Sequence, residues 1–410
     1  MLMRLFKTGL ICASLTIFMA APATAQLANP DSVKAELNKI ELLNGSMKQT
    51  IDKYKKNILK TGDLESMTLL GIECMNGKNV KGNMTIGLNL IETAAKQDYV
   101  DAQYNMGNYF YMFWQLKKDN DVYFRQGTNW LKKAIKAGDL RSQLVMAQFY
   151  NSYGIYKKQD TYVEGALKLL ETIPSVDEVN DQDDYILDAQ AMIGDICLAK
   201  WKNDQDTAAV RNAKKYYRLL LTSKKQYPTY SKYIDSLKLV LSSGVPLRID
   251  PMPTQEEIDA QAAAAAAGGM GGFPGGGMGG FGGGFPGGGF GGGFPGGGPQ
   301  AGPQAKFWSK DGQNMNQFIS KNTNYPKDLE DQRLKGSATV SFTVDVDGSV
   351  INPTVSREAE VHLMNQEALR TVMIMPDFIP AEQDGVKVQS QQSANVNFGS
   401  GGGMGGMMMF

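Results

Sequence analysis

The sequence predicts a multidomain protein made of an all-α solenoid of helical hairpin repeats, a disordered Gly-rich linker and a small α+β domain with an antiparallel sheet. Three observations support this prediction. Residues 26–250 show helical spacing of apolar residues with almost no strand signal. Residues 268–298 consist almost entirely of Gly, Phe, Pro and Met. Residues 307–398 combine strand-like alternation with helical spacing, which is typical of an α+β domain.

The first residues have the pattern of a secretory signal peptide. Arg4 and Lys7 precede a short apolar run, and Ala23 and Ala25 supply the small residues of a cleavage site after Ala25. The apolar run is too short to span a bilayer of about 30 Å as a helix. We therefore expect residues 1–25 to be removed on export. An uncleaved segment that anchors the protein in the inner membrane is the alternative.

The segment 26–250 contains an internal repeat. Four places share a small residue, then three variable residues, an apolar residue and another small residue. They are Ser66 to Leu70-Gly71, Ala102 to Met106-Gly107, Ser142 to Met146-Ala147 and Ala189 to Ile193-Gly194. The first three repeats continue into a second helix that carries Gly87, Gly127 or Gly165. Small residues let two helices approach closely, so the pattern predicts stacked helical hairpins. It resembles SEL-type repeats, which are relatives of the tetratricopeptide repeat.

The repeat alignment also predicts the environment of the cysteines. Cys74 and Cys197 occupy one position of the first and fourth repeats, which Phe110 and Tyr150 fill in the repeats between them. We therefore expect Cys74 and Cys197 to be packing residues between the helices. Because successive hairpins stack about 10 Å apart, the two thiols would exceed the Cα separation of about 7 Å that a disulfide allows. Lysine-rich stretches such as Lys214-Lys215 are expected on solvated helix faces.

Residues 251–306 are expected to form an Ala/Gly-rich flexible linker. Ordering so many glycines costs more conformational entropy than their few side chains can offset. A random coil of about 31 residues would span roughly 30 Å on average. Self-association through the repeated Phe-Pro units is an alternative role. The tail, residues 399–410, has a similar Gly- and Met-rich composition and is also expected to be disordered.

The segment 307–398 predicts the element order helix, strand, strand, helix, strand. Alternating apolar residues over 338–346 predict a half-buried strand. Asp347-Gly348 then fits a tight hairpin turn into a second strand. Apolar residues at helical spacing over 361–372 predict the helix, and residues 386–398 the last strand.

The motifs of this segment resemble the C-terminal domain of TonB-type energy transducers. The matching residues are Tyr325-Pro326, Gly336, Phe342-Thr343-Val344-Asp345, Asp347-Gly348, Glu367-Ala368-Leu369-Arg370, the run from Pro376 to Ala381, Gly385 and Val396-Asn397-Phe398. Phe378 departs from the family, since tryptophan is common at that position. The resemblance implies a protein of the periplasm or cell envelope of a Gram-negative bacterium.

The sequence predicts no catalytic, cofactor or metal site, and we do not expect an enzyme. The only histidine, His362, stands at the start of a predicted helix, and no group of His, Cys and acidic residues has metal-ligand spacing. The 42 basic residues are balanced by 42 acidic residues, which argues against a nucleic-acid surface.

The expected function is protein binding. In the resembled family, the last part of the domain receives a short segment of an outer-membrane transporter as an added strand. The resemblance implies that the corresponding edge comprises Val388, Gln389, Ser390, Gln391, Gln392, Ala394, Asn395 and Val396. A plain edge strand kept soluble by its glutamines is the alternative. The protein is thus an envelope interaction protein or, alternatively, a transducer that couples inner-membrane energy to transport through outer-membrane TonB-dependent transporters. The sequence names neither the partner nor the oligomeric state.

Overall fold

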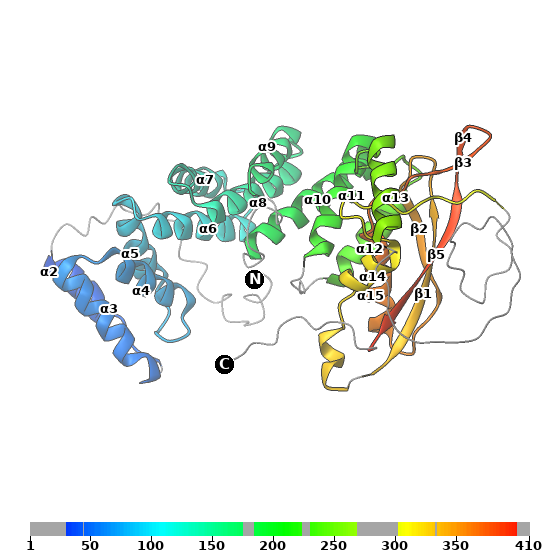
Figure 1. The fold of residues 1–410 in the computed structure, drawn as a ribbon. Helices are drawn as coiled ribbons and strands as arrows, with labels where there is room; N and C mark the ends of the chain where they lie inside the picture. Colours follow the sequence, from blue (N-terminus) through cyan, green and yellow to red (C-terminus); the bar gives the residue numbers. More distant parts are fainter. Residues whose placement is uncertain are drawn as a thin grey trace, which may run out of the picture. The chain divides into compact units, whose positions relative to one another are not determined.

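The computed structural model describes residues 30–43, 45–174, 184–223, 230–268, 302–332 and 334–399. The chain divides into two compact units between Ile173 and Pro174. The described part of the first unit contains helices, and the second combines helices with two small sheets (Figure 1). The expectations for residues 1–25, for the middle of the Gly-rich segment and for residues 400–410 lie outside the described residues.

The first unit is built from helical hairpins in sequence order (Figure 1). Its elements are α2 (Pro30–Asn38), η2 (Gly45–Met47), α3 (Lys48–Thr61), α4 (Leu64–Asn76), α5 (Met84–Lys96), α6 (Val100–Leu116), α7 (Asp121–Lys136), α8 (Leu140–Lys157) and α9 (Asp160–Glu171). Helices α4 and α5, α6 and α7, and α8 and α9 pack as pairs, and each pair contacts the next. The predicted region of helical hairpin repeats is confirmed.

The glycines of the repeat pattern lie where paired helices touch. A Cβ atom on Gly71 would lie 2.8 Å from the carbonyl oxygen of Gly87, and a Cβ on Gly87 equally close to that of Gly71. Gly107 and Gly127 face each other in the same way at 3.3 Å. These helices approach too closely for a larger residue, which explains why the small residues recur at this spacing.

Side-chain caps explain where several of these helices begin. The Asp63 carboxylate accepts a hydrogen bond from the Ser66 amide at 2.9 Å, and Asp139 accepts one from Ser142 at the same distance. Each cap satisfies an amide that has no partner within the first turn of its helix. Helices α4 and α8 therefore begin directly after an aspartate, at Leu64 and Leu140.

Cys74 and Cys197 behave as packing residues. Cys74 in α4 and Cys197 in α10 (Asp184–Asp204) are both buried and do not form a disulfide, as the repeat alignment predicted. Burial raises the pKa of the Cys74 thiol to about 11. At neutral pH this thiol is protonated and therefore a poor nucleophile.

The second unit joins further helices to an α+β domain. After α10 its elements are α11 (Thr207–Thr222), α12 (Tyr230–Leu241), α13 (Gln255–Gly268), α14 (Met315–Asn322), η3 (Lys327–Gln332), β1 (Gly336–Val344), β2 (Val350–Arg357), α15 (His362–Met373), β3 (Ala381–Gln383), β4 (Val386–Val388) and β5 (Ser390–Phe398). Helix α12 packs against α15 and β2, so this helix and the α+β domain belong to the same compact unit.

The main sheet has the strand order β2-β1-β5, and both pairs are antiparallel. Helix α15 packs against all three strands. The apolar residues of β1 that alternate in the sequence are buried, among them Val340 and Phe342. The turn residue Gly348 has φ +91°, which a glycine adopts without strain. The predicted hairpin, the helix after it and the antiparallel α+β fold are confirmed.

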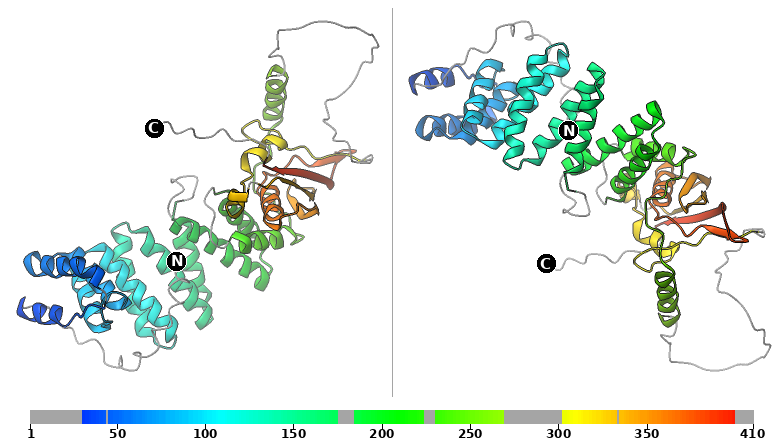
Figure 2. Two further views of the ribbon diagram at one scale, coloured as in Figure 1. Left: turned by 90° about the horizontal axis from the view of Figure 1, so that it is seen from below. Right: turned by 90° about the horizontal axis from the view of Figure 1, so that it is seen from above.

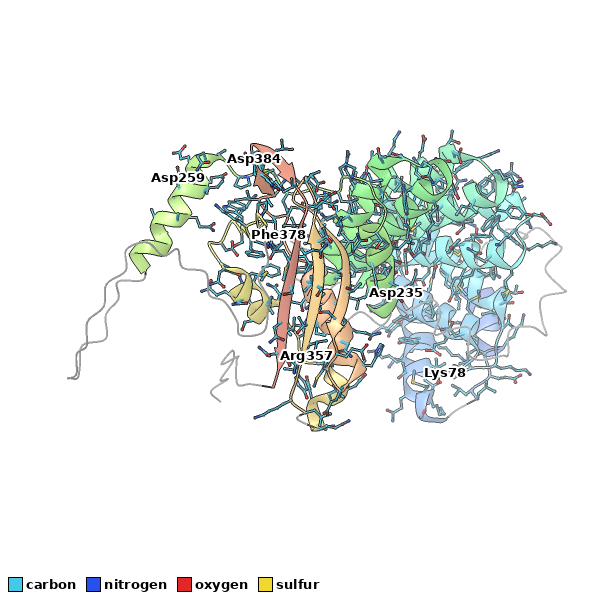
Figure 3. The ribbon with its side chains drawn as sticks, turned by 90° about the vertical axis from the view of Figure 1, so that its right-hand side faces the viewer. Lys78, Asp235, Asp259, Arg357, Phe378 and Asp384 are labelled. Atoms are coloured by element: carbon cyan, nitrogen blue, oxygen red, sulfur yellow. The ribbon has the colours of Figure 1, made fainter. Side chains whose placement is uncertain are left out.

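The last strand is more complex than the sequence pattern indicates. Residues 386–398 were expected to form one strand, but it is divided at Gln389 into β4 and β5. Strand β4 pairs with the additional strand β3 in a hairpin, with Asp384 marked at its tip in Figure 3. Asp384 and Gly385 have φ angles of +53° and +79°, as expected for a two-residue hairpin turn. The Asp-Gly pair is a local signal for this hairpin.

Both described ends of the segment 251–306 are folded. Residues 255–268 form α13, whose Gln261 side chain donates a hydrogen bond to the carbonyl of Ser309 at 2.8 Å. At the other end, Lys306 forms an antiparallel bridge with Ile379, and Ala305 is buried. Of the helices that the structure describes, none is both long enough and apolar enough to cross a membrane.

Candidate interaction edge

Strand β5 forms one margin of the main sheet (Figure 2). It pairs with β1 along its whole length, from Ser390 opposite Val344 to Phe398 opposite Gly336. Among the described residues, no strand pairs with the other side of β5. An unpaired strand edge presents backbone amide and carbonyl groups that an extended segment of another chain can bind.

The structure places most of the predicted edge residues on this strand, but not all. Ser390, Gln391, Gln392, Ala394, Asn395 and Val396 belong to β5. Val388 lies in β4, where it pairs with Ala381, and Gln389 lies between the two strands. Ala394 and Val396 point into the core, at 2 % and 0 % exposure, so their side chains cannot meet a partner. Only their backbone atoms are candidates for contact.

Two of the glutamines are engaged within the domain. The Gln389 side chain donates to the carboxylate of Asp345 at 2.8 Å, and the Gln391 side chain donates to the hydroxyl of Thr343 at 2.8 Å. The first bond joins the residue before β5 to the residue after β1, and the second joins β5 to β1. These side chains therefore stabilise the register of the sheet.

The start of β5 is also bordered by the chain that precedes α14. The Ala305 amide donates to the Ser390 hydroxyl at 3.1 Å. The Gln392 side chain donates to the Gln304 side chain at 3.0 Å and to the Ala305 carbonyl at 3.2 Å. The sequence did not indicate these contacts, because more than 80 residues separate the partners. Helix α14 also packs against β5, and among the described residues no strand pairs with the outer side of the second half of β5.

In this second half, exposed polar residues alternate with buried apolar ones. Ser393, Asn395 and Asn397 are exposed, and within the described part of the chain no side-chain hydrogen bond involves them. Ser393 and Asn397 were not among the predicted edge residues, although the alternation with Ala394 and Val396 points to them. This surface is uncharged and polar, which keeps an edge strand soluble and matches a partner that binds mainly through its backbone.

The described residues contain no group of three or more His, Cys, Asp or Glu side chains that could hold a metal ion. His362 is the first residue of α15. The Glu367 carboxyl of the same helix is buried, and burial raises its pKa to about 8 although the Asn324 amide donates a hydrogen bond to it. The Arg370 guanidinium lies 2.6 Å from this carboxyl. This pair lies within the core and is not part of the β5 edge.

A comparison with protein families identifies the domain that carries this edge. Residues 321–399 match the family of the Gram-negative bacterial TonB protein C-terminal domain. The match extends from the end of α14 through β5 and confirms the resemblance found in the sequence motifs. Searches of curated proteins and of solved structures gave no match. The chain thus carries a TonB C-terminal domain after a helical repeat region. This domain family serves protein interactions in the cell envelope.

Proposed function

We propose that this chain is a cell-envelope interaction protein whose TonB C-terminal domain binds an extended segment of an outer-membrane protein by strand addition to β5. The observation that supports the proposal most directly is the position of β5 at the margin of the sheet, where no described strand pairs with its outer side. The family match and the predicted signal peptide agree with an envelope location.

The arrangement of β5 defines what such a segment would contact. Backbone groups of residues 393–398 would supply the hydrogen bonds, and Ser393, Asn395 and Asn397 would lie beside the partner's side chains. A net contribution of about 1 kcal/mol for each hydrogen bond makes a six-residue strand a weak ligand, with a dissociation constant in the micromolar range or above. Weak binding suits an interaction that must form and release repeatedly.

Site-specific photo-crosslinking tests this proposal. A photoreactive amino acid at Asn395 is expected to crosslink an outer-membrane protein in the cells that produce this chain, at an extended segment that mass spectrometry can map. The same substitution at Thr354, an exposed residue of the opposite margin strand β2, is the matched control. Equal adducts from both positions, or none from Asn395, would refute strand addition at β5.

A second candidate function is energy transduction to TonB-dependent transporters in the outer membrane. The family match favours it, because the family is named for a transducer. A transducer must stay attached to the inner membrane, whereas an exported interaction protein begins at Gln26. Mass measurement of the N-terminal peptide of the mature protein distinguishes them. An intact Met1 or Met3 supports the transducer, and Gln26 at the N-terminus excludes an anchor formed by residues 1–25.

A further inference from the structure

A fully buried ion pair connects helix α11 to the TonB C-terminal domain. The Lys214 ammonium lies 2.6 Å from the Asp377 carboxylate, and the two side chains are 2 % and 1 % exposed. The ammonium also donates to the Leu247 carbonyl at 2.9 Å. This overturns the expectation that Lys214 lies on a solvated helix face. Burial lowers the pKa of Lys214, and the Asp377 carboxylate opposes that effect. Removing one partner of such a pair would leave an uncompensated charge in the core.

The same carboxylate binds the chain that follows α12. One oxygen of Asp377 accepts hydrogen bonds from the amides of Ile249 and Asp250, at 2.7 and 2.9 Å. The Asp250 carboxylate in turn accepts the Asp377 amide at 2.8 Å and two hydrogen bonds from Arg218 of α11, at 2.8 and 3.0 Å. The segment after α12 and the segment after α15 therefore satisfy each other's polar groups.

Arg248 extends this contact to the β1–β2 hairpin. Its guanidinium donates to the carbonyls of Asp347 and Phe378, at 2.8 and 2.7 Å, and its amide donates to the Asp347 carboxylate at 2.9 Å. The Phe378 amide donates to the Gly348 carbonyl at 2.8 Å. A Cβ atom on Gly348 would collide with the Phe378 carbonyl and the Arg248 guanidinium. Figure 3 marks Phe378 beside the strands at this end of the sheet.

Arg370 of α15 provides a contact at the end of α11. Its guanidinium, which is 1 % exposed, donates to the Leu221 carbonyl at 2.7 Å and to the Glu367 carboxylate at 2.6 and 2.8 Å. The last carbonyls of a helix have no partner within the helix and carry partial negative charge. Arg370 therefore caps α11 from within the TonB C-terminal domain.

The residues on either side of the Gly-rich segment, 249–250 and 306, are bound by neighbouring residues of the segment after α15. On the N-terminal side, Ile249 and Asp250 are held by Asp377. On the C-terminal side, Lys306 and Ile379 exchange two backbone hydrogen bonds of 2.9 Å each. Asp377 and Ile379 are two residues apart. The chain thus departs from and returns to neighbouring positions on one surface.

We infer that helices α11 and α12, residues 247–250 and the TonB C-terminal domain form one constitutive body, and that the Gly-rich segment is a loop on this body rather than the connection between two separate ones. The surface around Asp377 is the docking site, and its partner is the end of the helical region of the same chain. The inference does not depend on strand addition to β5, since it requires no second protein.

Cleavage of the loop tests the inference in the full mature chain. A recognition sequence for a site-specific protease is inserted between Gly283 and Gly284, and the chain is cut after purification. We expect the helical fragment and the C-terminal fragment to co-elute in gel filtration at about 1 µM, because separating them would expose the surfaces where α12 packs against α15 and β2 and would break the buried hydrogen bonds around Asp377. High salt is expected to leave them associated, since buried charge pairs are screened little.

Two substitutions identify the contacts responsible. Lys214→Met in the helical fragment and Asp377→Asn in the other are each expected to raise the dissociation constant of the cut protein at least about a hundredfold, as loss of one partner of a buried ion pair implies. Lys232→Met is the matched control, because it breaks an exposed 2.8 Å pair with Asp195 in the same unit, and no change is expected.

The cut wild-type protein by itself tests whether the two fragments form one body. If they separate at about 1 µM, whether or not each remains folded by circular dichroism, the inference is wrong and the segment is a tether. If they stay together but neither Lys214→Met nor Asp377→Asn weakens them more than Lys232→Met, the Asp377 surface is not the docking site. A substituted chain that no longer folds before cleavage is replaced by Arg248→Met, which lies at the edge of the same contact.

Discussion

At the scale of single residues, Gly348 has two separate reasons to be glycine. It turns the β1–β2 hairpin with φ +91°, and it allows the Phe378 carbonyl and the Arg248 guanidinium to approach its α-carbon. The Asp-Gly motif predicts the first role from local sequence alone. The second role depends on residues 30 and 100 positions away along the chain, which no local pattern indicates.

Comparison of two glycines separates these roles by experiment. Gly385→Ala introduces a side chain at φ +79° into open space, with only the Glu382 side chain at 4.0 Å, and is expected to destabilise the protein by about 1 kcal/mol. Gly348→Ala has the same backbone penalty and also displaces Phe378 and Arg248, so we expect a loss of about 3 kcal/mol or more. Urea unfolding of the full chain measures both values. Equal losses would show that the close approach at Gly348 contributes nothing to stability.

The neighbouring turn residue Asp347 accepts hydrogen bonds both from its own hairpin, through Ser349, and from Arg248. Burial alone would raise its pKa, but hydrogen bonds from the Ser349 hydroxyl and amide and from the Arg248 amide hold the pKa below its usual range. A carboxyl group with a lowered pKa in the folded protein adds stability above its unfolded pKa of about 4, and this stability is lost as the pH falls through the lower folded value. The contact between Arg248 and the hairpin is therefore favoured at neutral pH.

At the scale of elements, helix α15 packs against the sheet and also contacts α11 through the side chain of Arg370. Its apolar residues Met364, Ala368 and Val372 are buried, at the helical spacing that the sequence shows. Glu367 and Arg370 belong to the motif on which the family resemblance was recognised. Their pairing at 2.6 Å and the contact of Arg370 with Leu221 are results of the tertiary structure.

Substitution of Arg370 has a consequence that depends on pH. In Arg370→Met, the buried Glu367 loses its cation, so its pKa, which burial already raises, is expected to rise further. A carboxyl group with a raised pKa binds its proton more tightly in the folded protein, so stability falls as the pH rises from about 4.5 to 8. We expect a loss of about 3 kcal/mol at pH 8 and a smaller loss at pH 5, measured by urea unfolding.

The matched control for that prediction is the double variant Glu367→Gln/Arg370→Met. It removes the acidic group together with its partner, and we expect it to be more stable than Arg370→Met at pH 8 and nearly independent of pH between 5 and 8. If the single and double variants respond to pH in the same way, Glu367 is not the group that titrates.

At the scale of the whole molecule, the amino-acid pattern is informative wherever a local rule determines the structure. The recurring small residues locate the close helix contacts, Asp347-Gly348 locates the hairpin turn, and strict alternation locates β1. The same reasoning missed the β3–β4 hairpin, where two three-residue strands are too short to show a period of two. The domain boundary expected at residue 250 and the linking role of residues 251–306 stay predictions, and the inferred loop is the opposing proposal.

Helical spacing, glycine recurrence, turn chemistry and strand alternation depend on residues within a few positions of one another, so the linear chain was sufficient to predict a helical repeat region followed by a small α+β domain. The TonB family was indicated separately, by the resemblance of the motifs. The burial of Lys214 was decided only in three dimensions. Its partner Asp377 is 163 positions away, and a lysine followed by another lysine on a helix has the same local pattern whether it faces water or an acid in the core. Long-range pairing of charges leaves no periodic signal, because its cost and its compensation come from parts of the chain that meet only after folding.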